Sequence, residues 1–254
     1  MFEDLTGKVV LVTGASTGIG AAAARAFAQC GSRLVIHFNE SKAPAEDVAR
    51  DVRAAGAEAL LVQGDLTQMS SVDAVVAQTV EAFGRVDVLI NNAGGMLGRV
   101  RIEDYTEEHI TRVLALNVTQ VSMFMRAVIP IMRQQKSGNV INVTSIAARN
   151  GGGGGAVLYA AAKGFVSTAT RGWAKEVVAD GIRVNALSPG VIVTPFHERY
   201  STAEQLSAMQ ATVPMNRLGT PHECAGALLY LASDSMSSYV TGQIIEVNGG
   251  QYMP

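Results

Sequence analysis

The sequence alternates short apolar, β-branched runs with longer segments that favour helix, and this alternation limits the possible folds more than any other feature. We expect strands at residues 8–12, 33–37, 58–63, 86–90, 139–143, 181–187 and 243–247. Helices are expected at residues 21–29, 43–55, 71–83, 106–135 and 221–233, together with one that contains Tyr159. Such alternation indicates a parallel sheet with right-handed crossovers and helices on both faces. The predicted fold class is therefore α/β, a doubly wound sheet of seven parallel strands.

Composition and charge favour a single-domain cytoplasmic protein. With 254 residues, 48% of them hydrophobic, residues 1–254 can bury one large core, and no Pro/Ser-rich or charged linker divides them. The net charge of −2 offers no basic surface for nucleic acid or an anionic membrane. The first residues are acidic where a signal peptide is basic, and no run reaches the roughly 18 apolar residues of a spanning helix. Cys30 and Cys224 are isolated, so we expect neither a disulfide nor a metal site.

A glycine-rich loop follows the first expected strand. It reads Thr13-Gly14-Ala15-Ser16-Thr17-Gly18-Ile19-Gly20 and leads into an alanine-rich helix. Glycines let backbone N–H groups approach a diphosphate closely, and the start of a helix adds partial positive charge. Such a pattern is often an ordinary tight turn, but its place directly after the first strand favours a nucleotide site.

Polar residues follow the next strands. Asp65 is a candidate to accept a hydrogen bond from an adenine amino group, and the alternative is that it caps the following helix. Asn91 and Asn92 have amides that can join strand ends, while Gly94 leaves room for a ribose. Asn117 falls inside a long expected helix, where a buried amide is unfavourable unless it is hydrogen-bonded. It is therefore either a structural device or a site residue.

Tyr159 and Lys163 lie four residues apart in a helix-favouring segment, so their side chains share one face. A free tyrosine has a pKa near ~10, and an adjacent cation lowers that pKa. Tyr159 would then serve as a general acid/base. The Tyr-x-x-x-Lys pattern is undemanding, and alone it would more often be surface decoration. Its neighbours in the sequence favour a site.

Six motifs occur in one order along the chain: Thr13-Gly14-x-x-x-Gly18-x-Gly20, Asn91-Asn92-Ala93-Gly94, Asn117, Ser145, Tyr159-x-x-x-Lys163 and Pro189-Gly190. Each is loose alone, but in this order they resemble the short-chain dehydrogenase/reductase family over nearly the whole chain. The resemblance implies a Rossmann fold and an NAD(P)-dependent oxidoreductase that moves a hydride between nicotinamide and a small carbonyl or secondary-alcohol substrate. It also implies a homotetramer in which the helices that hold Asn117 and Tyr159 pair.

Carried over residue by residue, the resemblance implies that Tyr159 is the acid/base and that Lys163 lowers its pKa and binds the nicotinamide ribose. Ser145 would polarise the substrate oxygen. Asn117 would hold a water that links Lys163 to solvent. Besides Tyr159 and Lys163, the expected cofactor contacts are Gly14, Ser16, Thr17, Gly18, Ile19, Gly20, Asn39, Ser41, Asp65, Leu66, Asn92, Ala93, Gly94, Pro189, Gly190, Ile192 and Thr194.

The sequence after the second strand bears on cofactor choice. Phe38 stands where NAD-preferring relatives carry an aspartate. Asn39, Ser41 and Lys42 are suited to the 2′-phosphate of NADP, although Glu40 would repel it if it pointed inward. The predicted cofactor is therefore NADP, with NAD as the alternative.

The substrate pocket is less determined. Ser145 and Tyr159 are separated by more residues than the family pattern has, because a run of glycines, 151–155, lies between them. Residues 195–216 are expected to form a substrate lid, with a plain surface excursion as the alternative. Candidate pocket residues are Gly95, Met96, Leu97, Arg149, Val157, His197 and Tyr200. The alternative function is a catalytically silent dinucleotide-binding sensor or scaffold, which has no need of the complete set of four catalytic residues.

Overall fold

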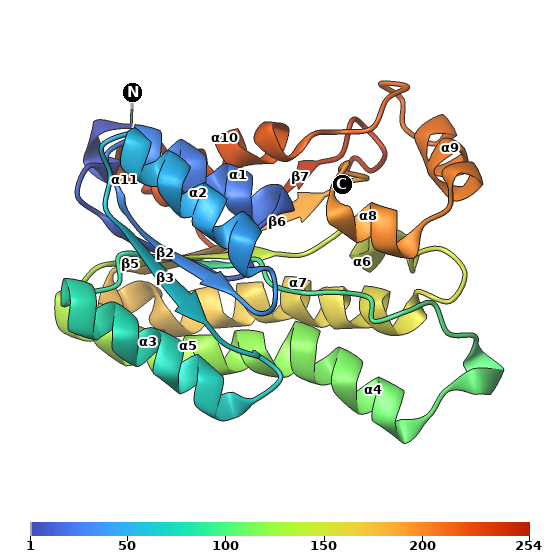
Figure 1. The fold of residues 1–254 in the computed structure, drawn as a ribbon, viewed down its shortest axis with the longest axis horizontal. Helices are drawn as coiled ribbons and strands as arrows, with labels where there is room; N and C mark the ends of the chain where they lie inside the picture. The colour runs from blue at the N-terminus through green and yellow to red at the C-terminus, as the bar shows by residue number, and fades with distance from the viewer. Residues whose placement is uncertain (1) are drawn as a thin grey trace.

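A computed structural model describes residues 2–254 and contains one seven-stranded sheet in the order β3-β2-β1-β4-β5-β6-β7 (Figure 1). All neighbouring strands are parallel, which confirms the predicted α/β fold class. The strands are β1 (Val9–Val12), β2 (Arg33–Phe38), β3 (Ala59–Gln63), β4 (Val88–Asn91), β5 (Gly138–Val143), β6 (Ile182–Pro189) and β7 (Ile244–Val247). The strand order reverses between β1 and β4, and a crevice outside the carboxyl ends of strands is expected at such a point.

Helices cover both faces of the sheet. One face carries α1 (Gly18–Gln29), α2 (Lys42–Ala54) and α10 (Pro221–Ala232), and the other carries α3 (Met69–Phe83), α5 (Gln120–Gln135) and α7 (Val157–Val177) (Figure 1). The short helices α6 (Ala147–Asn150) and α11 (Asp234–Ser237) were not predicted. Single helical turns occur at Glu3–Leu5, Ile102–Asp104 and Val178–Asp180.

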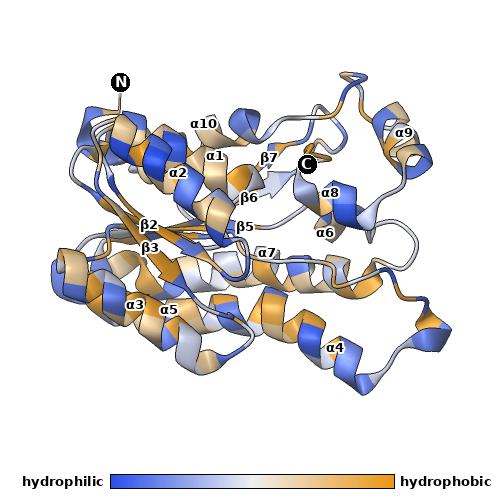
Figure 2. Cartoon of the chain, viewed as in Figure 1, coloured by the Kyte–Doolittle hydropathy of each residue, from blue (hydrophilic) through white to orange (hydrophobic). Residues whose placement is uncertain are grey.

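The strands are apolar on both sides, as a sheet between two helical layers requires. In β1, Val10 and Val12 belong to one buried cluster, while Val9 and Leu11 belong to the other. This alternation follows from the two-residue period of a strand. Figure 2 shows the same division, with apolar strands inside and polar helix surfaces outside. The continuous apolar runs in the sequence therefore place the sheet at the centre of two cores.

The helix predicted at 106–135 is interrupted. It consists of α4 (Glu107–Leu114), a π-helical segment (Ala115–Thr119) and α5. Asn117 lies in the π segment, and its Nδ2 donates a hydrogen bond to the carbonyl oxygen of Val113 at 2.9 Å. A side-chain amide bonded into the helix backbone is a known cause of such local widening.

The stretch Glu107–Gln135 is also long and apolar enough to cross a membrane by length and composition, although such a test is also passed by core helices. Phe124, Val128 and Met132 of α5 are completely buried against the sheet. The absence of a membrane partner stays a prediction.

The segment predicted as a lid contains two helices, α8 (Pro195–Tyr200) and α9 (Ala203–Ala211). Thr202 and Gln205 form a capping box at the start of α9. Figure 1 shows both helices beyond the carboxyl ends of the strands. The segment is therefore folded, and its action as a lid stays a prediction.

Candidate active site

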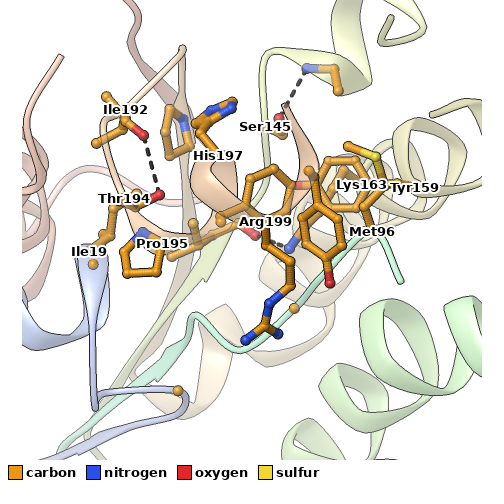
Figure 3. A pocket seen from close by; sticks show the side chains of 18 of the residues that line it. Ile19, Met96, Ser145, Tyr159, Lys163, Ile192, Thr194, Pro195, His197 and Arg199 are labelled. Atoms are coloured by element: carbon orange, nitrogen blue, oxygen red, sulfur yellow. Dashed lines mark hydrogen bonds between the residues drawn. The ribbon is translucent and has the colours of Figure 1, made fainter. Parts of the chain in front are cut away.

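One cleft of about 970 Å³ occupies the carboxyl edge of the sheet and extends from the glycine loop to α8 and α9 (Figure 3). Of the predicted catalytic residues, Ser145, Tyr159 and Lys163 line it. Asn117 and Gly20 do not. The remaining predicted cofactor contacts all line the cleft: Gly14, Ser16, Thr17, Gly18, Ile19, Asn39, Ser41, Asp65, Leu66, Asn92, Ala93, Gly94, Pro189, Gly190, Ile192 and Thr194.

The glycine loop is shaped by close approach of backbones. Gly14 and Gly18 have φ angles of +61° and +57°, in the left-handed region that favours glycine. A Cβ on Gly20 would lie 2.5 Å from the Gly14 oxygen and 2.6 Å from Nδ2 of Asn92. Gly20 therefore supports the loop from behind, which corrects the prediction that it contacts the cofactor.

Two asparagines join strand ends, as the sequence predicted. Nδ2 of Asn91 donates to Oδ1 of Asn142 at 2.9 Å, which ties β4 to β5. Nδ2 of Asn92 donates to the carbonyl oxygens of Thr13 and Gly14 at 2.8 and 3.0 Å. The glycine loop is thereby fixed to the end of β4.

Asp65 does not cap a helix, so the alternative given for it is wrong. The residue before α3 is Gln68, which makes no side-chain cap. Oδ1 of Asp65 instead accepts hydrogen bonds from the backbone N–H and the hydroxyl of Thr67, at 2.9 and 2.8 Å. This local turn holds Asp65 in the wall of the cleft.

His37 is a residue of the cleft that sequence reasoning set aside. Its Nδ1 accepts a hydrogen bond from the Gly14 N–H at 3.1 Å, and its Nε2 lies 2.9 Å from the carbonyl oxygen of Gly64. These contacts specify the tautomer with hydrogen on Nε2. Burial lowers the pKa of His37, so the neutral ring is favoured. The ring connects the glycine loop to the end of β3, and the one available signal was a histidine inside an apolar strand.

Ser145, Tyr159 and Lys163 converge from two elements. Ser145 follows β5, and its Oγ accepts a hydrogen bond from the Ala147 N–H at 3.1 Å, so its own proton can be donated toward Tyr159 or a substrate oxygen. Tyr159 and Lys163 project from α7, with Nζ 5.9 Å from the phenol ring centroid. Nζ of Lys163 donates to the carbonyl oxygen of Val143 at 2.8 Å.

Burial dominates the ionisation of this pair. It raises the pKa of Tyr159 to about 12, although a hydrogen bond with Ser145 opposes the rise. It lowers the pKa of Lys163 to about 8. The lowering of the Tyr159 pKa by Lys163, which the resemblance implied, stays a prediction.

Gly94, which has no side chain, leaves a space beside Asn117 and Lys163. An added Cβ would lie 2.9 Å from Oδ1 of Asn117 and 3.0 Å from Nζ of Lys163. Asn117 also binds Gly95 in both directions, accepting from its N–H at 3.1 Å and donating to its oxygen at 2.8 Å. The amide is thus fully hydrogen-bonded, and the space left by Gly94 suits a flat ligand group beside Lys163. The donors and the bare backbone along the cleft fit a dinucleotide.

The substrate end differs from the expected lining. Met96, Leu97, His197 and Tyr200 line the cleft as predicted, whereas Gly95, Arg149 and Val157 do not. Arg149 points elsewhere, to Glu246, with which it makes an ion pair at 2.8 Å. Arg99, Arg112 and Asn150 are among the cleft residues that the sequence did not indicate, and Phe196 and Arg199 line the cleft from the segment predicted as a lid. Their positions depend on loops that meet only in the folded chain.

Comparisons with known proteins agree with this geometry. A family model described as enoyl-(acyl carrier protein) reductase matches residues 14–251. A curated 3-oxoacyl-[acyl-carrier-protein] reductase from Synechocystis is 40% identical over 98% of both chains. The chain belongs to the short-chain dehydrogenase/reductase family. It is accordingly an NAD(P)-dependent oxidoreductase that transfers a hydride between nicotinamide and a carbonyl or secondary alcohol.

Solved structures show the same fold throughout. An NADH-dependent reductase responsible for alginate metabolism, in complex with NAD, superposes with a TM-score of 0.90 at 37% identity and full coverage of both chains. A short-chain type dehydrogenase/reductase from Mycobacterium marinum superposes with a TM-score of 0.92 at 32% identity, covering 100% of this chain and 98% of the other. The predicted family and reaction class are confirmed.

Proposed function

We propose that the protein is a carbonyl reductase in which Tyr159 donates the proton and Ser145 orients the substrate oxygen. The observation that carries this proposal is the convergence of Tyr159, Ser145 and Lys163 on one cleft whose glycine-lined end suits a dinucleotide. The bound nicotinamide would supply or accept the hydride. Gly14, Asn92 and Gly94 would border it.

The residues of the chain then have separate tasks. The Ser145 hydroxyl donates a hydrogen bond to the carbonyl oxygen, which Tyr159 protonates as negative charge develops there. A phenol with a pKa of about 12 is protonated at neutral pH and ready to donate. Lys163, with a pKa of about 8, is mostly charged at pH 7 and can return a proton toward Tyr159. These ionisation states are the ones that a proton donor in carbonyl reduction needs near neutral pH.

The test is Tyr159→Phe, which removes the proton and keeps the ring. We expect NADH affinity within a few-fold of the parent and turnover reduced by at least ~100-fold. Fluorescence titration reports cofactor binding, and absorbance of the reduced nicotinamide reports turnover. Near-normal turnover in this variant would exclude Tyr159 as the proton donor.

For cofactor choice we propose a preference opposite to the one predicted from the sequence. Asn39, Glu40 and Ser41 line the adenosine end of the cleft, while Lys42 does not. Nζ of Lys42 instead lies 3.8 Å from Glu46 on the surface of α2. A carboxylate without a nearby lining cation disfavours a 2′-phosphate and can accept from ribose hydroxyls. We therefore expect NADH to bind at least as tightly as NADPH.

We also propose that the protein is a cytoplasmic homotetramer that acts on a small molecule. Apolar side chains on α4 and α7 are exposed in the single chain: Leu114 is 42%, Val157 47% and Phe165 45% accessible. An outward apolar face on these helices supports their pairing between copies. Sedimentation velocity checks this, and a monodisperse monomer would contradict it.

A silent dinucleotide sensor is the competing function. It would bind NADH but oxidise none of it with any carbonyl compound. The Ser145 hydroxyl, aimed at Tyr159, and the protonated Tyr159 argue against it, because a binder has no need of either.

A further inference from the structure

The charged side chains that line the cleft are separated by sign. The acidic ones, Glu40 and Asp65, follow β2 and β3 at one side of the sheet. Arg99, Arg112 and Arg199 come from the loop after β4, from α4 and from α8. The sheet order places β4, β5 and β6 on the opposite side from β2 and β3. Among the described residues 2–254, arginines line the end of the cleft that holds the reacting groups, and no carboxylate does.

Arg99 is fixed in the wall without a counter-charge. Its Nε donates to the carbonyl oxygen of Tyr200 and its Nη1 to that of Gly154, both at 2.8 Å. The next residue, Val100, donates its N–H to the oxygen of Gly155 at 3.1 Å. Both acceptors of the guanidinium are neutral carbonyls, so no carboxylate offsets its positive charge. Its field reaches the lid, where the pKa of His197 is lowered first by burial and then by Arg99.

Arg199, in α8, adds a second positive charge to this end of the cleft. Figure 3 shows its guanidinium pointing into the pocket, on the same side as Tyr159 and Lys163. Within the described part of the chain, Arg199 makes no ion pair, whereas Arg149 outside the cleft is paired with Glu246. Guanidinium groups bind carboxylate and phosphate oxygens through paired N–H donors.

We propose that the substrate is a carbonyl compound that also carries an anionic group, a carboxylate or a phosphate, bound by Arg99 and Arg199. Its carbonyl oxygen lies at Ser145 and Tyr159. This inference rests on the proposed reductase function. The anionic group is not changed in the reaction: the carbonyl carbon gains the hydride, and its oxygen gains the proton of Tyr159. Arg99 and Arg199 are binding residues for the unreacting part of the substrate.

The experiment compares carbonyl compounds in matched pairs, each with an anionic and a neutral member: a 2-oxo acid with its ethyl ester, and a phosphorylated hydroxyketone with the free hydroxyketone. The two pairs separate carboxylate from phosphate recognition. For each pair, the ratio of kcat/KM between the members is measured in the parent, in Arg199→Gln and in Arg99→Gln. Arg101→Gln is the control, because Arg101 lies in the same loop, is exposed and does not line the cleft.

We expect the parent to favour the anionic member of one pair. Arg199→Gln should reduce that preference at least tenfold through KM of the anion, with the neutral member and NADH affinity unchanged. Arg99→Gln should act in the same direction and Arg101→Gln should have no effect. Arg199 is exposed, so its variant tests the inference even if Arg99→Gln does not fold.

Two results would overturn the inference and leave the reductase intact: equal preference ratios in the parent and Arg199→Gln, or weaker NADH binding in Arg199→Gln with the ratio preserved. The second result would assign Arg199 to the cofactor phosphates. Oxidation of NADH by no member of the panel would remove the proposed function, and the inference with it.

Discussion

Replacing Gly20 with alanine tests whether the steric cost of an added Cβ in the glycine loop exceeds the gain in helix propensity. Gly20 lies in the first turn of α1, where an added Cβ would lie 2.5 Å from the Gly14 oxygen and 2.6 Å from Nδ2 of Asn92. Either the loop or Asn92 must move to admit it. Gly226 in α10 is the matched control, since a Cβ there meets nothing within 4 Å.

The two substitutions should have effects of opposite sign. An exposed helical glycine is about 1 kcal/mol less favourable than alanine. With an unfolding entropy of ~2.1 cal/mol/K per residue, this chain has ~0.5 kcal/mol/K, so Gly226→Ala should raise Tm by about 2 °C. At Gly20 the same gain is opposed by roughly 1–3 kcal/mol of overpacking and by about 1 kcal/mol for a weakened Asn92 hydrogen bond. The net loss of about 1–3 kcal/mol lowers Tm by about 2–6 °C.

Scanning calorimetry measures both shifts, and fluorescence titration measures NADH affinity. We expect Gly226→Ala to bind NADH as the parent does and Gly20→Ala to bind at least ~10-fold more weakly, because Gly14 and Asn92 are displaced. A Tm rise in Gly20→Ala that matches the Gly226→Ala rise, with unchanged NADH affinity, would refute the close approach of the loop and β4.

Three further predictions follow from ionisation and charge. Burial lowers the Lys163 pKa to about 8, so the charged side chain destabilises the folded state. Lys163→Met should therefore abolish turnover yet stabilise the protein by roughly 3 kcal/mol at pH 7. Denaturant titrations should show this gain shrinking between pH 8 and about 10.5. The pKa of His37 is lowered, so stability should fall as pH drops below about 6.5, where the unfolded chain starts to take up a proton that the folded ring does not. NADH affinity should fall only at lower pH, below the lowered pKa of the folded ring, where the ring loses its acceptor for the Gly14 N–H; His37→Asn should flatten that affinity profile. Glu40→Gln should tighten NADPH binding several-fold relative to NADH, by about 1 kcal/mol, as measured by paired titrations.

The sheet could be predicted because its strands are continuous apolar runs that both helical layers bury. Once their order and direction are set, the chain segments that follow each strand must meet at one edge. The glycine loop, Asp65, Asn92 and Ser145 all follow strands, so the sheet brings them to one cleft. Tyr159 and Lys163 share a helix face by their spacing, and the motifs elsewhere in the sequence were needed to predict that this face belongs to a site.

The missed features depend on contacts between distant segments. Arg99 reaches Gly154 across 55 residues and Tyr200 across 101, so no local pattern indicates its position. The π segment at Asn117 has the same origin, because Gly95, 22 residues away, binds the amide that widens the helix. The prediction of Arg149 in the pocket failed for a related reason: Glu246, 97 residues later, holds its guanidinium outside the cleft.

The proposed reduction and the proposed anionic substrate are both connected to the burial of Tyr159 and Lys163. Formation of a phenolate at pH 7 from a group with a pKa of about 12 costs roughly 7 kcal/mol, whereas donation of the phenolic proton needs no prior ionisation. An anionic substrate held by Arg99 and Arg199 would bring negative charge near both groups. Negative charge favours the protonated phenol and the protonated amine. Binding such a substrate would therefore keep Tyr159 as a proton donor and Lys163 charged, which are the states that carbonyl reduction requires.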